Sequence, residues 1–468
     1  MLAMASSISS ARAESDLPEL LRDYFRAPSA ARMKAAEKEI INRKGLTHEQ
    51  LARAIGEVNL WDNREPGDYE MTLRLRKGKS SEKSVFVHVP KGYTPEKAWP
   101  LLIAFHGQGA RPEPMLKGTL IALGDLKDEF IVVAPDRIGA IEPAEGEPAE
   151  YHGALAFTYP HAVVGQPRML LDAIRREFRI DSDRVYLMGF SLGSHNAWMA
   201  GIMHADCFAG LMPLATPLQV VGNDLLYESL LSNLRDVPIV YCWGEKDNLD
   251  SAGKPEPSGG NVGISRTLSM VIKALGFPDY TAVELAGAGH LDVVPPPEEF
   301  YKLLKKTRRR YPKRVHQIFR LPEESSAYWV STDHLQGEPL PHGPLQIPQS
   351  PDEDPRTATR RFLLGKLGLI EATCKKQTIT IRSKNAVRIT LLLGDELIDL
   401  DKPIKIKRGR KTVFDGRIER DLRVMLREAA SGWDFNRLPS ARVVIPIAGD
   451  IKFGYGDEPK KSSGRKRK

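Results

Sequence analysis

The sequence contains little cysteine. Of 468 residues only three are cysteines, Cys207, Cys242 and Cys374, and no two of them form a C-x-x-C pair. There is no cluster of histidine and cysteine at metal-ligand spacing either. The sequence therefore excludes a disulfide framework and argues against a structural zinc site. We expect neither a metal nor a cofactor.

Long apolar runs and internal repeats are also missing. No stretch approaches the roughly 18 apolar residues that a membrane-spanning helix needs, so we expect no membrane span. A hydrophobic content of 41% with 27% charged residues is typical of a folded globular chain. The 468 residues exceed the about 150 residues typical of one domain. We therefore expect two or three units.

The formal charge of +8 is unevenly distributed. Six of the positive charges lie in the last nine residues, at Lys460, Lys461, Arg465, Lys466, Arg467 and Lys468. Without this tail the chain is close to neutral. A charge run at a chain end is typical of a solvated, disordered terminus rather than of a specific anionic partner, so we expect no nucleic-acid partner.

The N-terminal segment leaves two interpretations open. Ala11-Arg12-Ala13 resembles an A-x-A cleavage site, but the preceding residues have no basic start and too short an apolar stretch for a complete secretory signal. Residues 1–13 are either the end of a signal peptide whose start lies upstream or a frayed helix end. The first predicts an exported protein, periplasmic or extracellular, and the second a cytoplasmic one.

The first two thirds of the chain predict helices followed by alternating strands and helices. Residues 16–61 have apolar residues at helical spacing, and Thr47 to Gln50 has the form of a capping box. Strands are expected at 69–75, 84–90, 101–107, 130–136, 237–244 and 281–285, and helices at 165–178 and 300–310. This alternation predicts an α/β fold with a mostly parallel sheet wrapped by helices.

The last third has a different pattern. Residues 338–356 are rich in proline and predict a loop or linker without a helix. Short strands of period-two alternation follow, at 377–383, 385–394, 402–418 and 441–447, with a hairpin around Gly409. They predict a β-sandwich. We therefore divide the chain into an N-terminal helical segment (1–62), an α/β catalytic domain (63–311), a β-sandwich-like accessory domain (312–452) and a basic disordered tail (453–468).

A serine between two glycines stands where a buried strand meets a helix. In Gly189-Phe190-Ser191-Leu192-Gly193 the glycines allow a turn too tight for side chains at its flanks, which lifts the serine above the sheet. The alternative is that Ser191 only caps the helix that follows, a position that favours small hydroxyl residues. The pentapeptide alone does not decide between the two.

A nucleophilic serine needs a base and an acid, because its hydroxyl is not deprotonated at neutral pH without help. Reading forward, the strand at 237–244 ends in Glu245-Lys246-Asp247, and the strand at 281–285 ends in a glycine-rich loop with His290. Serine, acid and histidine thus follow three strand ends in order. We predict Ser191 as nucleophile, Asp247 as acid and His290 as base; Glu245 and Asp250 lie close enough to compete for the role of the acid.

The reaction also needs donors for the negative oxygen of a tetrahedral intermediate. The strand at 101–107 ends in His106-Gly107-Gln108-Gly109, where the glycines let the backbone approach a substrate. We predict the backbone N–H groups of Gln108 and Leu192 as the oxyanion hole. His106 and His195 are interpreted as structural.

Five segments carry a resemblance to a known family: "FHGQG", "VVAPD", "DRVYLMGFSLGS", "VYCWGEKD" and "GAGH". On these motifs residues 84 to about 306 resemble a serine esterase of the α/β-hydrolase superfamily, close to the carboxylesterase/phospholipase and polyhydroxybutyrate-depolymerase-like branch. The resemblance implies the same roles for Ser191, Asp247, His290, Gln108 and Leu192. One departure is Ser194, since members commonly have a second glycine there.

These observations predict a metal-independent hydrolase of carboxylic esters that works through an acyl-enzyme. Its substrate would be a small-molecule or polysaccharide ester. A prolyl-oligopeptidase-like serine peptidase is the alternative enzyme, although no propeller precedes the catalytic domain. The other alternative is an inactive hydrolase domain attached to a carbohydrate- or surface-binding sandwich. The acyl group, the alcohol and the oligomeric state do not follow from the sequence.

Overall fold

The computed structural model describes residues 16–75, 82–136, 166–218, 229–248, 260–337, 347–446 and 451–455. Residues 1–13 and all but the first three residues of the expected basic tail lie outside these ranges. The two interpretations of the N-terminal segment and the expected disorder of the tail therefore stay predictions. Among the described residues no helix is both long enough and apolar enough to cross a membrane.

The largest sheet has eight strands in the order β1-β2-β4-β3-β5-β6-β7-β8. Neighbours are parallel from β4 to β8, whereas β1 pairs antiparallel with β2, and β2 with β4. The predicted mostly parallel sheet is confirmed. Its strands are β1 (Gly67–Arg74), β2 (Glu82–Val89), β3 (Trp99–Phe105), β4 (Ile131–Pro135), β5 (Ile180–Phe190), β6 (Gly210–Leu214), β7 (Ile239–Gly244) and β8 (Tyr280–Leu285).

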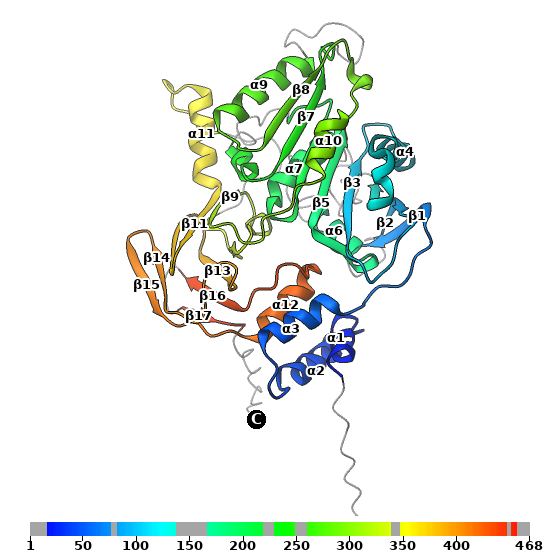
Figure 1. Ribbon diagram of the computed structural model, residues 1–468. Coiled ribbons are helices and arrows are strands. Elements are labelled where there is room, and N and C mark those ends of the chain that lie inside the picture. The colour runs from blue at the N-terminus through cyan, green and yellow to red at the C-terminus, as the bar shows by residue number, and fades with distance from the viewer. Residues whose placement is uncertain are drawn as a thin grey trace, which may run out of the picture.

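Helices cover both faces of this sheet (Figure 1). Alternate residues of β3 belong to different cores: Leu101 and Ile103 pack with the helices of one face, and Leu102 and Ala104 with those of the other. Because both faces are covered, β3, β4, β6 and β7 are buried along their whole length, which is why they read as continuous apolar runs. The first face carries α6 (Gln166–Glu177), α7 (Leu192–Met203) and α9 (Gly260–Ala274), and the second carries α4 (Pro112–Leu123) and α10 (Pro297–Leu303).

The helix expected around 300–310 is shorter than predicted. Helix α10 ends at Leu303, and the arginines that continue its sequence pattern lie in irregular backbone. One of them, Arg308, has only 5% of its surface exposed. Leaving the helix allows its guanidinium to reach buried carboxylates on other elements, a tertiary contact with no local sequence signal.

The C-terminal part forms two facing sheets, which confirms the predicted sandwich. Their orders are β10-β13-β16-β17 and β15-β14-β12-β11-β9, and β12 with β14 is the parallel pair. Apolar residues from both sheets make one core. The predicted hairpin joins β14 and β15 through Gly409, which has a φ of 58°. The strands are β9 (Arg314–Phe319), β10 (Val330–Ser331), β11 (Gly368–Lys375), β12 (Thr378–Lys384), β13 (Arg388–Leu393), β14 (Ile404–Arg408), β15 (Lys411–Gly416), β16 (Ala441–Pro446) and β17 (Lys452–Phe453).

Two helices in this part were not predicted. Helix α11 (Pro355–Lys366) begins within the last two residues of the segment for which we predicted no helix, and Asp354 caps it. Helix α12 (Leu422–Gly432) is capped by Asp421 and does not join the sandwich core. Each is preceded by an aspartate whose carboxylate accepts a hydrogen bond from a backbone N–H. Such a capping aspartate is a sequence signal for a helix start, and it was missed in the sequence analysis of the strand pattern.

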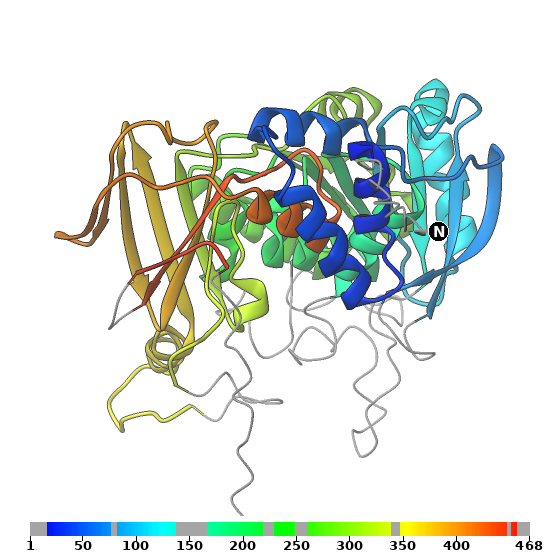
Figure 2. The same ribbon diagram turned by 90° about the horizontal axis from the view of Figure 1, so that it is seen from below.

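Helix α12 instead packs with the N-terminal helices α1 (Leu17–Phe25), α2 (Ala30–Ile41) and α3 (His48–Glu57). The predicted capping box of Thr47 and Gln50 is present. Trp61 and Trp433, which lie just beyond these helices, meet with ring centroids 6.1 Å apart. The N-terminal helices therefore share a core with a helix from near the other end of the chain. Figure 2 shows them beside the sandwich, across the underside of the part that contains the eight-stranded sheet.

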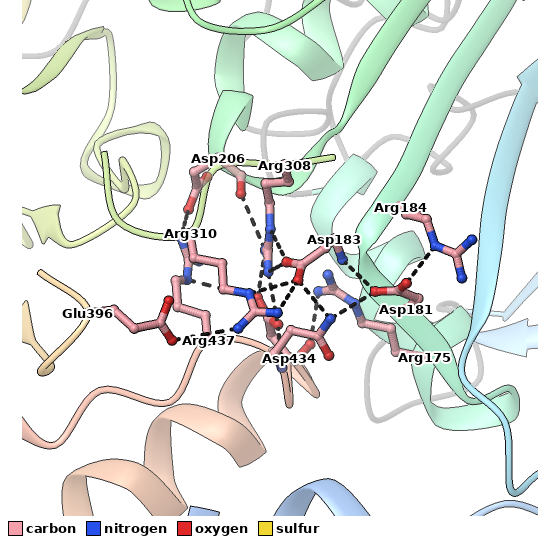
Figure 3. Close-up of polar contacts among 12 residues, drawn as sticks. Arg175, Asp181, Asp183, Arg184, Asp206, Arg308, Arg310, Glu396, Asp434 and Arg437 are labelled. Atoms are coloured by element: carbon pink, nitrogen blue, oxygen red, sulfur yellow. Dashed lines mark hydrogen bonds and ion pairs between the residues drawn. The ribbon is translucent and has the colours of Figure 1, made fainter. Parts of the chain in front are cut away.

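Buried ion pairs join the part that contains the eight-stranded sheet to the C-terminal part (Figure 3). Arg308 contacts Asp183 of β5 at 3.0 Å and Asp434, just after α12, at 2.7 Å. Arg437 contacts Asp206, which precedes β6, at 3.0 Å. Burial by itself would raise the pKa of the Asp434 carboxyl, but the charges of Arg308 and other nearby arginines outweigh it and lower that pKa. The accessory parts thus dock near the beginnings of β5 and β6, at the opposite edge from their carboxyl ends.

Candidate active site

Ser191 lies in a strained turn between β5 and α7. Its φ is 53° and its ψ is −120°, a conformation that costs energy for a residue with a side chain. A Cβ added at Gly189 would lie 2.0 Å from the carbonyl oxygen of Gly193, and one added at Gly193 would lie 2.0 Å from that of Phe105. The side chain of Ser191 makes no capping hydrogen bond to α7. The alternative role as a helix cap is therefore wrong.

The hydroxyl of Ser191 faces a histidine that in turn faces a carboxylate. Ser191 Oγ lies 2.8 Å from His290 Nε2, and His290 Nδ1 lies 2.8 Å from Asp247 Oδ2. These residues follow β5, β8 and β7, whose carboxyl ends lie at the same edge because they are parallel. An ionised carboxylate only accepts, so Nδ1 carries the proton and Nε2 accepts from the serine hydroxyl.

Burial differs along this chain of hydrogen bonds. The side chain of Asp247 is 4% exposed and that of His290 is 33% exposed. The ring of Phe190 packs 5.6 Å from the imidazole, between centroids. The acid is thus shielded from water, while the imidazole edge near Ser191 is accessible to a substrate.

The two predicted oxyanion donors lie on either side of Ser191. Leu192 is the first residue of α7, and Gln108 follows β3 in the loop that contains Gly107. A Cβ added at Gly107 would lie 3.1 Å from Ser191 Cβ, so the absence of a side chain lets this loop pass close to the serine. Within the described residues neither backbone N–H donates a hydrogen bond to the protein. Their role as oxyanion donors therefore stays a prediction.

The two other histidines near the serine do not face its hydroxyl. His106 is buried, and its Nδ1 donates to the carbonyl of Gly107 at 2.8 Å. Burial lowers the pKa of His195 to about 4, so this side chain is neutral at pH 7. Ser194, which departs from the family pattern, is fully buried and donates to the carbonyl of Thr216 at 2.6 Å. Its hydroxyl is satisfied there and faces away from Ser191.

The acids that compete with Asp247 have different positions. Glu245 Oε2 accepts from the backbone N–H of Gly287 at 2.8 Å, so this side chain holds the loop before His290 rather than the imidazole. Asp250 lies outside the described residues. Asn261, at the start of α9, was missed by the sequence analysis: its Nδ2 lies 3.2 Å from Asp247 Oδ1 and 3.3 Å from Oδ2. A lone asparagine at a helix start gives no signal of such a contact.

A second serine is also paired with a histidine. Ser232 Oγ lies 3.0 Å from His316 Nε2, and His316 Nδ1 lies 3.4 Å from Glu371 Oε1. These residues line a cavity of about 580 Å³ between the part that contains the eight-stranded sheet and the sandwich. Ser232, however, lies in ordinary helical backbone and donates to the carbonyl of Ser229. Its φ is not positive, so it lacks the strained turn that holds Ser191.

The described part of the chain contains no candidate set of metal ligands. No group of three or more histidine, cysteine, aspartate and glutamate side chains is arranged there to hold a metal ion. All three cysteines are buried, and burial raises the pKa of the Cys207 thiol to about 11.

A comparison with protein families matches residues 80–255 to a family described as "Putative esterase". The matched segment is thus similar to this esterase family over less than half of the chain. Ser191 and Asp247 lie inside the matched range, and His290 lies beyond it. A feruloyl esterase B of Piromyces equi is 27% identical over 167 residues, which cover 36% of this chain and 30% of that protein. The match thus spans less than a third of the curated relative.

Solved structures are similar to about half of this chain at low identity. A ferulic acid esterase from Anaeromyces mucronatus has a TM-score of 0.38 at 18% identity, with 52% of this chain and 91% of that chain covered. A poly(3-hydroxybutyrate) depolymerase from Bordetella parapertussis has a TM-score of 0.38 at 18% identity, with 52% and 90% covered.

Proposed function

We propose that this chain is a serine hydrolase that cleaves carboxylic esters through an acyl-enzyme on Ser191. The observation that carries the proposal is the pair of 2.8 Å contacts that link Ser191 Oγ to His290 and His290 to Asp247. The esterase family of residues 80–255 supports it. Neither a metal nor a cofactor is needed for this chemistry.

The proposed reaction has two half-reactions. His290 Nε2 takes the proton as Ser191 Oγ attacks the ester carbonyl, and the imidazolium then gives it to the departing alcohol oxygen. In the second half, His290 takes a proton from water, the resulting hydroxide attacks the acyl-enzyme, and Ser191 regains its proton as the acid leaves. Asp247 keeps the imidazole in the required tautomer and stabilises its positive charge in both halves.

The negative oxygen that forms in each half-reaction is assigned to the N–H groups of Gln108 and Leu192. Loss of one such donor typically costs about a hundred- to a thousandfold in rate. Substitutions other than proline leave a backbone donor in place, so the position of the Gln108 N–H depends on the close approach of the Gly107 loop to Ser191. A side chain at Gly107 would push Gln108 away from the serine.

Feruloyl esters are the first substrates to test, because the curated relative carries the name feruloyl esterase. A panel of methyl ferulate, nitrophenyl esters of increasing chain length and acetylated glycans would separate an aromatic acyl preference from an aliphatic one. We expect hydrolysis of at least one carboxylic ester and none of a matched prolyl peptide. Cleavage of the peptide alone would favour the peptidase alternative.

The nucleophile is tested with Ser191→Ala and the control Ser232→Ala. A fluorophosphonate should label the wild type and Ser232→Ala but not Ser191→Ala, and ester hydrolysis should follow the same pattern. Both serines lie within hydrogen-bond distance of a histidine, but only Ser191 lies in a strained turn. The control therefore tests whether a serine–histidine pair is sufficient for reactivity. Labelling that persisted in Ser191→Ala and vanished in Ser232→Ala would move the active site to the cavity by the sandwich.

A further inference from the structure

The Asp247 carboxylate has two side-chain donors in the described part of the chain. His290 Nδ1 lies 2.8 Å from Oδ2, and Asn261 Nδ2 lies 3.2 Å from Oδ1 and 3.3 Å from Oδ2. Oδ1 therefore has Asn261 as its one donor within those residues. Because the Asp247 side chain is 4% exposed, bulk water does not readily replace a lost donor.

Asn261 is held against the loop of the acid by the first turn of α9. The neighbouring Gly260 has a φ of 59°, and a Cβ there would lie 2.7 Å from the Cα of Asn248. The backbone N–H of Val262 donates to the carbonyl of Asp247 at 3.0 Å. The first turn of α9 thus packs against the loop that carries Asp247, and the amide of Asn261 is part of this contact.

The same turn is tied to the strand that delivers the acid. Ser265 Oγ donates to the carbonyl of Asn261 at 2.6 Å, and the hydroxyl of Tyr241, on β7, lies 2.6 Å from Ser265 Oγ. A serine hydroxyl has one proton, so Tyr241 donates in this pair. Burial raises the pKa of Tyr241 well above its usual value, and the phenol keeps that proton. Asp247 and its amide donor are therefore both positioned by β7.

We infer that Asn261 is a positioning residue for the proposed triad. Its amide fixes the Asp247 carboxylate so that Oδ2 faces His290 Nδ1, and it takes up part of the negative charge by donating to both oxygens. Asn261 Nδ2 also lies 3.5 Å from His290 Nδ1. Asn261 therefore contacts both the acid and the base of the proposed triad. This inference rests on the proposed function.

Replacement of Asn261 by leucine tests the inference, because leucine has a similar volume, no donor and leaves no space for a water. We expect kcat to fall by about 10- to 100-fold, the effect typical of an unsatisfied buried acceptor, with little change in KM. The acidic limb of kcat/KM should move to higher pH by up to about one unit, because the carboxylate keeps more of its charge beside the imidazole.

Two further variants separate this role from helix stability. Asn261→Ala leaves room for a water that donates in place of the amide, so its loss of kcat and its shift of the acidic limb should both be smaller than those of Asn261→Leu. Ser265→Ala breaks the link between α9 and β7 but keeps the Asn261 amide and the contact of Val262 with the carbonyl of Asp247. It should lower the melting temperature and move the acidic limb less than Asn261→Leu does. An equal shift of that limb in Ser265→Ala, or an unchanged rate and profile in either Asn261 variant, would overturn the inference.

The measurements are made on the full chain beside Ser191→Ala. Hydrolysis that survives in Ser191→Ala contradicts the proposed function and the role of Asn261 together. If Ser191→Ala is inactive and Asn261→Leu has the wild-type rate and pH profile, only the positioning role fails. The rate of fluorophosphonate labelling at Ser191 gives the same comparison without knowledge of the natural ester, and it should fall in Asn261→Leu in proportion to kcat/KM.

Discussion

At the scale of single residues, the neighbourhood of Asp247 differs from that of other acids close by in sequence. Asp247 is buried and lies 2.8 Å from His290, whereas Glu245 accepts from the backbone of Gly287. Glu245 thus acts on the loop that carries His290, and Asp247 acts on its ring. The two carboxylates lie two residues apart in the sequence and contact different groups.

Because Asp247 and Glu245 contact different groups, we expect different effects from replacing each carboxylate by the amide of the same shape. Asp247→Asn should lower kcat by roughly ten-thousandfold, because the amide favours the wrong tautomer of His290. Glu245→Gln retains an oxygen that accepts from Gly287, and we expect a loss of less than about tenfold. Steady-state kinetics on one ester measure both. A more severe loss in Glu245→Gln than in Asp247→Asn would refute the choice of the acid.

At the scale of elements, the junction of β5 and α7 depends on the absence of two side chains. Gly189 and Gly193 lie where a Cβ would meet backbone atoms at 2.0 Å, and backbone cannot rotate away as a side chain can. The strained φ of Ser191 persists because this packing leaves no alternative path. The turn positions the serine hydroxyl and the N–H of Leu192 together.

Gly189→Ala should therefore destabilise the fold by at least about 3 kcal/mol and abolish ester hydrolysis. The matched control is Gly118→Ala, in the exposed interior of α4, where an added Cβ meets nothing within 4 Å. That change should stabilise the protein by roughly 0.5 to 1 kcal/mol, because alanine favours helix. Urea unfolding followed by circular dichroism measures both. Equal stability of the two variants would contradict the packing argument.

At the scale of the whole molecule, the accessory parts are joined to the hydrolase domain by buried charges. Asp183 and Asp206 belong to the hydrolase domain, and Asp434 and Arg437 to the C-terminal part. The lowered pKa of Asp434 means that its ion pairs stabilise the fold above about pH 4 and lose that effect as the pH falls further. The domain boundaries, including the one at residue 311, stay a prediction. Charged side chains before and after that residue nevertheless form buried ion pairs with one another.

Two adjacent arginines test this junction. Arg308→Ala removes the fully buried partner that Asp183 and Asp434 share, while Asp183 keeps Arg310 and Asp434 keeps Arg437. It should cost about 3 kcal/mol of unfolding free energy at pH 7. Arg309 pairs with Asp236 at 3.0 Å with its side chain 57% exposed, and Arg309→Ala should cost at most about 1 kcal/mol. Urea titration compares them. Similar losses in the two variants would mean that the buried network does not hold the parts together.

The sequence by itself determined the local features of this protein. The mostly parallel sheet, the turn at Ser191, the capping box at Thr47 and the hairpin at Gly409 all follow from periodicity, glycine and capping residues within a few positions of one another. The positions of Ser191, Asp247 and His290 after three strands, in that chain order, were also predicted from the sequence, because parallel strands end at the same edge.

Only the tertiary structure decided which distant residues meet. The amide of Asn261 on the acid, the early end of α10 at Leu303, the packing of α12 on the N-terminal helices and the partners of Arg308 each join segments far apart in the chain. Such contacts have no period and no fixed spacing. They arise from the packing of complete elements, where a buried charge or carboxylate must find a partner wherever the fold brings one.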